Sequence, residues 1–174
     1  MYKFHYLIMK PAFNNCLEIC FQDTDSYLYE INLPNITDQL YRLKEFFDFS
    51  NYDKNHLLYS DENKKIPGLF KSETGSETIL QFCGLRSKCY SLVTNKDQKL
   101  AAAGVKKCKQ RLLKHYDYVE TLCNFRTRYV KQKSIVSHSH NLFTQEQTRI
   151  ALSPVDIKRY ILSDGINTIP YGYF

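Results

Sequence analysis

The sequence predicts an α+β fold, because hairpin-like and helix-like segments share one chain. Two short runs of β-branched, aromatic and aliphatic residues, 17–21 and 27–31, flank the polar turn Asp23-Thr24-Asp25, which is typical of a β-hairpin. Apolar residues at helical spacing follow in residues 37–47. Strand-like runs then return in residues 76–94.

Composition is that of an ordinary globular protein. The length of 174 residues corresponds to about one domain, and 43% of the residues are hydrophobic and 24% charged. The six cysteines include no CxxC pair, and the sequence has no signal peptide, so we expect reduced, mostly buried thiols in an intracellular protein, nuclear or cytoplasmic. No apolar run approaches the roughly 18 residues of a membrane span, so no membrane partner is expected.

Charge is distributed unevenly along the chain. Residues 1–85 carry 8 basic and 12 acidic side chains, a net charge of −4. Residues 86–133 carry 13 basic and 3 acidic side chains, a net charge of +10, and residues 134–174 are balanced with 3 of each. A solvated helix surface can hold such lysines without any ligand, but this surplus is also typical of a phosphate-binding surface.

The turn at residues 23–25 is the principal candidate for a chemical site. Asp favours tight turns because its side chain hydrogen-bonds nearby backbone, so the turn can be purely structural. Two carboxylates one residue apart nevertheless repel each other, and a divalent cation relieves that repulsion. Mg²⁺ is commonly held by one or two carboxylates, with waters and substrate phosphates as its other ligands.

The first two helices are predicted from apolar spacing. Residues 1–10 place Phe4, Leu7 and Ile8 on one face, and Pro11 is expected to end this helix. The segment resembles the end of a longer helix, so the chain is expected to be a fragment. Thr37 is the predicted cap of the next helix, with Asp38 in its first turn. Its apolar face comprises Leu40, Leu43, Phe46 and Phe47.

A polar loop over residues 48–65 leads to the strands of residues 76–94. Within the second strand lies Lys88-Cys89-Tyr90, where residue type alone places the lysine outward and the tyrosine partly inward. A short basic helix is expected over residues 106–114, which include Lys106 and Lys107, and another over 116–123.

The remaining segments are expected to be largely strand. Residues 125–141 alternate basic and apolar side chains, as in a strand with one basic face. The basic members are Arg126, Arg128, Lys131 and Lys133. His138-Ser139-His140 can place two imidazoles on one strand face, but without a third ligand an exposed strand end or turn is favoured.

The string FQDTDS, flanked by apolar strands, resembles motif C (YxDTDS) of family B DNA polymerases. In that family the motif lies on a hairpin of the palm subdomain, and its carboxylates belong to a two-metal site for nucleotidyl transfer. The resemblance implies that Asp25 is the main Mg²⁺ ligand and Asp23 the accompanying carboxylate. Phe21 stands where the family more often has Tyr.

Further motifs follow in the order of the protein-primed branch of this family, which occurs in viruses, linear plasmids and Maverick/Polinton transposons. They are DFSNY at 48–52, KIPGLFK at 65–71, a K-x-Y signature at 88–90, GVKK at 104–107 with HYDY at 115–118, and ALSP, KRYIL, DGI and YG from residue 151 onward. Pro67 within the second motif argues for an edge strand. Tyr173 stands where the family tends to have His.

The resemblance implies two regions. Residues 1–95 would be the end of a palm, with the motif C hairpin and the K-x-Y strand, and residues 96–174 a basic, thumb-like region. Lys88 would then meet a backbone phosphate, Tyr90 the primer terminus, and Lys106 and Lys107 further DNA phosphates. The implied partners are a DNA primer-template, deoxynucleoside triphosphates and a terminal protein.

The family's exonuclease domain and its motifs A and B have no counterpart in the sequence. Motif A supplies another metal-binding Asp, and motif B holds the incoming nucleotide, so the family activity is nucleotidyl transfer in DNA replication but this chain alone is expected to be inactive. The expected partner is the missing N-terminal polymerase portion. The alternatives are an inactive DNA-binding remnant of a viral or transposon polymerase, or an inert remnant.

Overall fold

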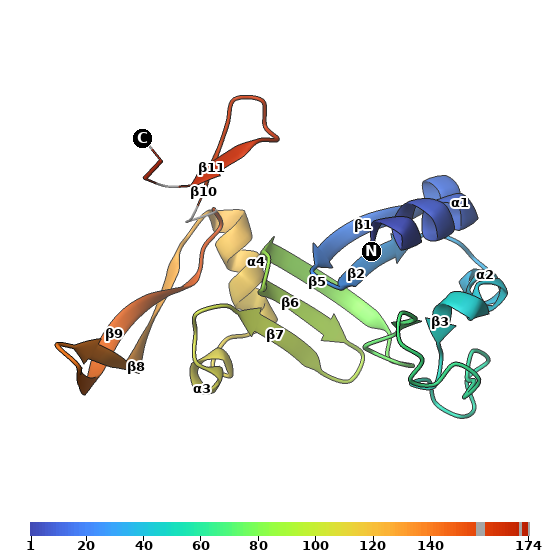
Figure 1. Cartoon of the computed structure of the whole chain (residues 1–174), viewed down its shortest axis with the longest axis horizontal. Helices are drawn as coiled ribbons and strands as arrows, with labels where there is room; N and C mark the ends of the chain where they lie inside the picture. Colours follow the sequence, from blue (N-terminus) through green and yellow to red (C-terminus); the bar gives the residue numbers. More distant parts are fainter. Residues whose placement is uncertain (156–158, 171, 174) are drawn as a thin grey trace. The chain divides into compact units, whose positions relative to one another are not determined.

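A computed structural model describes residues 1–155, 159–170 and 172–173, and the chain divides into two compact units, Met1–Ile79 and Leu80–Phe174 (Figure 1). Both helices and small sheets are present, which confirms the α+β class. The first unit ends at Ile79. The strands that carry the K-x-Y signature therefore belong to the second unit.

The first unit begins with a helix that covers one face of a hairpin (Figure 1). A π-helical segment, Phe4–Met9, continues into α1, Lys10–Phe13, and then into a 3₁₀ turn, Asn14–Cys16. The prediction that Pro11 ends the helix is wrong. Pro11 is the second residue of α1, in its first turn, where proline is tolerated.

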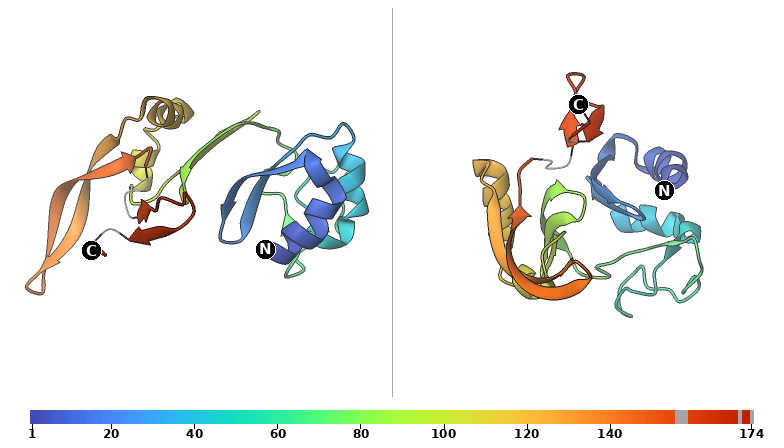
Figure 2. Two further views of the ribbon diagram at one scale, coloured as in Figure 1. Left: turned by 90° about the horizontal axis from the view of Figure 1, so that it is seen from above. Right: turned by 60° about the vertical axis from the view of Figure 1, so that its left-hand side comes forward.

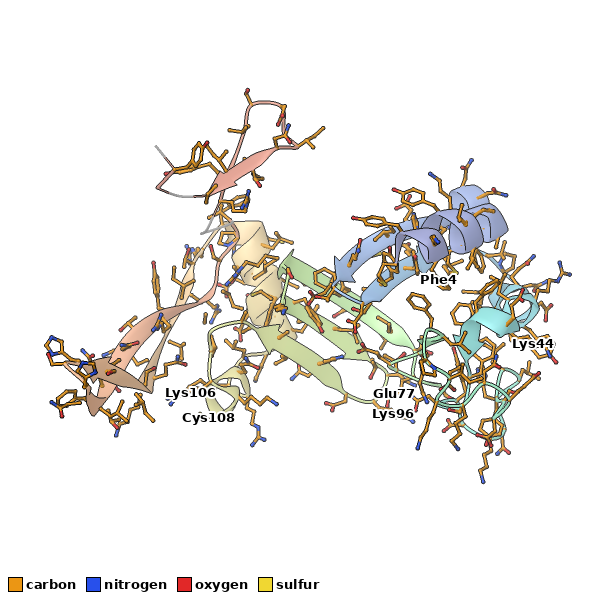
Figure 3. The ribbon with its side chains drawn as sticks, viewed as in Figure 1. Phe4, Lys44, Glu77, Lys96, Lys106 and Cys108 are labelled. Atoms are coloured by element: carbon orange, nitrogen blue, oxygen red, sulfur yellow. The ribbon has the colours of Figure 1, made fainter. Side chains whose placement is uncertain are left out.

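The hairpin consists of β1, Leu17–Asp23, and β2, Ser26–Ile31, in antiparallel register. Phe4, Met9 and Phe13 of the helix form the buried core against it. The ring of Phe4, which is labelled in Figure 3, also stacks on Phe70, with centroids 3.7 Å apart. The aromatic and aliphatic residues that predicted the hairpin thus supply the apolar face that it buries.

The helix α2, Ile36–Arg42, is shorter than predicted. Its N-cap is Asn35 rather than Thr37, and no side chain caps it. Asp38 lies in the first turn as expected. The 3₁₀ turn Lys44–Phe46 and the strand β3, Phe47–Asp48, follow, so Phe46 and Phe47 reach the same core from other elements.

A long polar loop connects β3 with its parallel partner β4, Phe70–Lys71. Asp48 is buried at the start of this loop, where its carboxylate accepts hydrogen bonds from the backbone N–H groups of Ser50 (2.9 Å) and Lys65 (3.1 Å). The ammonium of Lys71 lies 3.3 Å away. Burial alone would raise the pKa of Asp48, but these hydrogen bonds outweigh it and hold the pKa well below the ordinary carboxyl value.

The second unit is built on a three-stranded sheet in the order β5-β6-β7. The strands are β5, Ile79–Arg86, β6, Cys89–Thr94, and β7, Gln98–Ala102. A short helix α3, Lys107–Gln110, and the longer α4, His115–Asn124, follow. Tyr118 of α4 is fully buried and donates a hydrogen bond to the carbonyl of Ala101, which joins the helix to the sheet.

Two hairpins complete the second unit. A long ribbon is formed by β8, Arg128–His138, and β9, Asn141–Leu152, whose base is buried at Ala151 and Leu152 (Figure 2). A short hairpin is formed by β10, Arg159–Ile161, and β11, Thr168–Pro170. Lys158 and Tyr171, which contribute to the C-terminal family motifs, lie outside the described residues.

All six cysteines are free thiols, but the prediction that most are buried is wrong. Only Cys83 and Cys89 are buried, both in the core of the second unit, where burial raises the pKa of each thiol. Cys16 is half-buried and the other three are exposed.

Candidate functional site

The carboxylates of the predicted metal site lie at the tip of the β1–β2 hairpin. Asp23 and Ser26 are the last paired residues, so Thr24 and Asp25 form a two-residue turn. The hydroxyl of Ser26 donates to the carbonyl of Asp23 (3.1 Å), and the hydroxyl of Thr24 donates to its carboxylate (3.1 Å). The local sequence therefore produces the tip that was predicted for it.

The backbone at this tip is unusual. Thr24 has φ = 49°, a left-handed conformation that β-branched residues rarely adopt. A register shift between Ile19 and Phe21 also introduces an irregularity in β1 close to the tip. Irregularities of this kind bend a strand and redirect its side chains, and they are frequent beside functional sites.

Orientation of the hairpin follows from its register. Tyr27, Tyr29 and Ile31 face the N-terminal helix and belong to the apolar cluster around Phe4. Because side chains alternate along a strand, Ser26 and its cross-strand partner Asp23 face the opposite side. Asp23 is half-buried and Asp25 is exposed. The carboxylate of Asp23 therefore lies on the hairpin face that the helix leaves uncovered.

The donor set at the tip fits Mg²⁺ that keeps most of its waters. Mg²⁺ is usually bound through one or two carboxylates together with phosphate oxygens, rather than by a closed protein cage. Within the described residues, no group of three or more His, Cys, Asp or Glu side chains is arranged to hold a metal ion. Asp23 and Asp25 can thus supply part of a metal site, with the remaining ligands coming from elsewhere.

The K-x-Y residues lie at the turn between β5 and β6. Lys88 is exposed and has φ = 57°, because it belongs to the turn rather than to the predicted strand. Its carbonyl accepts a hydrogen bond from the backbone N–H of Ala103 (2.9 Å). Tyr90 lies on β6 and is half-buried. The predicted outward lysine and partly buried tyrosine are both observed.

Lys106 and Lys107 are exposed at the start of α3 (Figure 3 labels Lys106). The predicted basic helix over 106–114 is confined to four residues. Two glutamines that the sequence analysis did not single out hold this segment in place. The side chain of Gln132 accepts from the backbone N–H of Lys106 (2.9 Å) and donates to the carbonyl of Gly104 (3.1 Å).

The second glutamine, Gln110, donates to the carbonyls of Ala102 (2.8 Å) and Val105 (2.9 Å). The backbone that presents the two lysines is therefore fixed by side chains of α3 and β8. Nothing in the sequence marks Gln132 for this role, because its partners lie 26 and 28 residues away along the chain.

The predicted basic face of residues 125–141 is only partly present. Arg128 forms ion pairs with Asp117 (3.1 Å) and Glu120 of α4, so its charge is neutralised within the second unit. Arg126 precedes the strand. Lys131 and Lys133 share one face of β8, and Glu146 lies opposite Lys133 across the ribbon. The free cationic surface of this strand is thus smaller than the sequence indicated.

The two imidazoles of the HxH pattern do not occupy one strand face. His138 is the last residue of β8, and His140 lies in the turn with φ = 64°. This placement is the exposed strand end or turn that the sequence favoured.

The candidate residues fall into two groups in different units. Asp23 and Asp25 belong to the first unit, and Lys88, Tyr90, Lys106 and Lys107 belong to the second. No helix among the described residues is long and apolar enough to cross a membrane. Comparison with known protein families, with curated proteins and with solved structures finds no match. The assignment to family B polymerases therefore rests on the motifs and stays a prediction.

Proposed function

We propose that this chain is part of a DNA-directed DNA polymerase of the protein-primed family B type. It would contribute motif C of a two-metal nucleotidyl-transfer site and contacts to the primer-template. The observation on which the proposal rests is the β1–β2 hairpin, in which Asp23 is the last paired residue of β1 and Asp25 belongs to the two-residue turn that follows it. The order of the remaining motifs in the sequence supports the same reading.

The chemistry assigned to each group follows from its position. Bound Mg²⁺ would activate the primer hydroxyl and neutralise charge on the triphosphate. Asp25 and Asp23 would hold one side of the metal site. Lys88 would contact a phosphate of the primer-template, and Lys106 and Lys107 would neutralise phosphates further along the duplex. Carboxylates equivalent to motif A and the nucleotide-binding residues of motif B would come from another polypeptide segment.

A second function, an inactive DNA-binding remnant, is favoured by the charge of the second unit. Residues 80–174 hold 16 basic and 6 acidic side chains, a net charge of +10, whereas residues 1–79 have a net charge of −4. DNA binding of this kind requires no catalytic site. Sequencing transcripts that include this reading frame distinguishes the two functions. Motifs A and B encoded upstream in the same frame would support a polymerase. A stop codon or frameshift upstream would support a remnant.

The activity test uses the chain alone and the chain joined to such an upstream segment. Alone, it should show no template-dependent incorporation of labelled nucleotide, because it supplies only one side of the metal site. The joined protein should incorporate nucleotide, and Asp25→Ala should abolish this activity. Incorporation by the isolated chain that disappears in Asp25→Ala would contradict the division of the metal site proposed here.

A further inference from the structure

The lysines proposed to contact DNA, Lys88, Lys106 and Lys107, come from two separate segments of the chain. In the structure the two segments are joined directly by a backbone hydrogen bond. The carbonyl of Lys88 accepts the backbone N–H of Ala103 (2.9 Å), one residue beyond the paired strands β6 and β7. The turn that carries Lys88 is therefore attached to the segment that leads into Lys106 and Lys107.

The attachment limits how far apart the lysines can lie. Residues that pair through backbone hydrogen bonds have Cα atoms about 5.5 Å apart, and successive Cα atoms are about 3.8 Å apart. Because Ala103 is three residues before Lys106, the Cα atoms of Lys88 and Lys106 are at most about 17 Å apart. One turn of duplex DNA is about 34 Å long. A single short duplex can thus contact both segments.

The charge of this surface has one sign. Residues 98–116 contain six basic side chains and no acidic side chain. Five of the six follow β7, and none of these five forms an ion pair with any residue that the structure describes: Lys106, Lys107, Lys109, Arg111 and Lys114. The flanking acidic residues are Asp97, at the opposite end of β7, and Asp117, which pairs with Arg128. The unpaired cations make this segment complementary to a polyanion.

A buried, uncharged side chain fixes the backbone of the same segment. Gln132 is 6% exposed, and its amide group bridges the carbonyl of Gly104 and the backbone N–H of Lys106. Gly104 has φ = 89°, a conformation in which glycine is at ease but which constrains the chain little. The course of the backbone into Lys106 therefore depends on the two hydrogen bonds of Gln132. A backbone that is already ordered lowers the cost of ordering on binding.

We propose that Lys88, Lys106 and Lys107 form one phosphate-binding surface for duplex DNA, and that Gln132 is the positioning residue of this surface. This inference rests on the DNA binding proposed for the second unit. It adds that affinity depends on where the lysines are held as well as on their charge. Gln132 itself would not touch DNA and would act only through the backbone of Gly104 and Lys106.

The test measures binding of the full chain to a recessed-end duplex of about 10 base pairs, one helical turn, by fluorescence anisotropy at several salt concentrations. Gln132→Met keeps an unbranched side chain of similar length, removes both hydrogen bonds and leaves the net charge unchanged. It should weaken binding about fivefold near 0.15 M salt and reduce the log-log salt slope by about 0.9, the equivalent of one phosphate contact.

A double-mutant cycle separates positioning from general stability. Lys106→Gln with Lys107→Gln should weaken binding strongly in the wild-type chain but much less in the Gln132→Met background, because the lysines there have already lost their placement. Lys88→Gln should also reduce the salt slope on the same short duplex, since both segments contact it.

Gln145→Met is the matched control, because Gln145 is an exposed glutamine on the other strand of the same ribbon and should affect neither affinity nor slope. Circular dichroism verifies that each variant is folded, and amide exchange of Lys106, observed by NMR, should be faster in Gln132→Met. If Gln132→Met does not fold, Gln110→Met is the second variant. Gln110 holds the same segment through the carbonyls of Ala102 and Val105, and its loss should have the same effect on binding.

Three outcomes would overturn the inference while leaving DNA binding by the second unit intact. The first is unchanged affinity and slope in a folded variant whose Lys106 amide exchanges faster. The second is a lysine effect of equal size in both backgrounds, which would make Gln132 merely structural. In the third, Lys88→Gln has no effect on the short duplex, so the lysines do not share one surface. Absence of any duplex binding by the wild-type chain at low salt would instead remove the proposed DNA contact itself.

Discussion

Single residues at the hairpin tip carry the proposed chemistry, and one of them has an unfavourable conformation. A left-handed backbone costs a residue such as Thr24 on the order of 1–2 kcal/mol. Strain of this kind persists where the surrounding structure maintains it, and it is frequent at functional sites. The paired strands on both sides maintain it here, and the turn keeps Asp23 and Asp25 at one end of the hairpin.

Divalent cation binding by the isolated chain should be detectable but weak. Two carboxylates leave most coordination positions to water when the partner aspartate and the substrate phosphates are absent. NMR titration with Mg²⁺, or line broadening by Mn²⁺, should affect residues around the tip. Asp25→Ala should reduce the effect, and the double alanine variant at positions 23 and 25 should remove it. Tight binding, or binding that survives in the double variant, would contradict the assignment.

Asp48 should stabilise the first unit in a pH-dependent way. Its folded pKa lies below the ordinary value, so its stabilisation is fully present above the ordinary carboxyl pKa and is lost as the pH falls toward the folded pKa. Asp48→Asn should lower the free energy of unfolding by about 2 kcal/mol near pH 7, because a buried charged acceptor loses strong hydrogen bonds.

The difference between wild type and Asp48→Asn should shrink as the pH falls below about 4. Urea unfolding at several pH values measures it. Asp53→Asn, at an exposed carboxylate of the same loop, is the matched control and should have little effect. A difference in stability that is constant from neutral to acidic pH would show that the charge of Asp48 is not responsible.

Among the elements, the loop between β3 and β4 has the least regular secondary structure, and specific residues fix its course. Asn51 donates a side-chain hydrogen bond to the carbonyl of Ser72 (3.0 Å). Gly75 approaches the same asparagine so closely that a Cβ atom would lie 2.5 Å from its carbonyl oxygen. The φ of Gly75 is also positive, at 58°. Both facts require glycine at this position.

Gly75→Ala should therefore destabilise the first unit by more than the cost of the backbone conformation alone, which is about 1 kcal/mol. Gly68→Ala is the matched control, because Gly68 also has a positive φ (91°) but a Cβ atom added there would meet nothing within 4 Å. Chemical denaturation of the two variants should give a clearly larger loss for position 75. Equal losses would mean that the contact with Asn51 relaxes without cost.

At the scale of the whole molecule, charge is divided in the same way as structure. The first unit is acidic overall and the second strongly basic, so we expect DNA binding to be confined to the second. Lys106→Glu with Lys107→Glu should weaken binding uniformly across sequences and reduce the salt slope, because phosphate contacts release counterions whatever the bases are. Lys88→Ala should lower overall affinity less but remove any preference for a recessed primer end.

Lys64→Glu with Lys65→Glu is the matched control, since it reverses two adjacent exposed lysines in the first unit. Fluorescence anisotropy at several salt concentrations should show little effect of this change on DNA binding. If both charge reversals weaken binding equally, net charge rather than a located surface determines the interaction. A salt-independent signal would show that Lys106 and Lys107 are only solvated.

The features that the sequence by itself determined are local or compositional. The β1–β2 hairpin was predictable because strand propensity, alternation and turn chemistry all act within 15 residues of the chain, Leu17–Ile31. The helix α4, His115–Asn124, was also predicted closely, as residues 116–123. The charge difference between the two parts of the chain is a property of composition and needs no structure.

Tertiary structure decided whatever depends on distant partners. The boundary between the two compact units lies at Ile79, because the strand β5 pairs within the sheet of the second unit. Arg128 does not contribute a free positive charge to the predicted basic face of β8, because it forms ion pairs with Asp117 and Glu120 of α4. Gln132 positions Lys106 across 26 residues. None of these contacts produces a periodic or local pattern in the sequence, because each depends on packing between segments far apart in the chain.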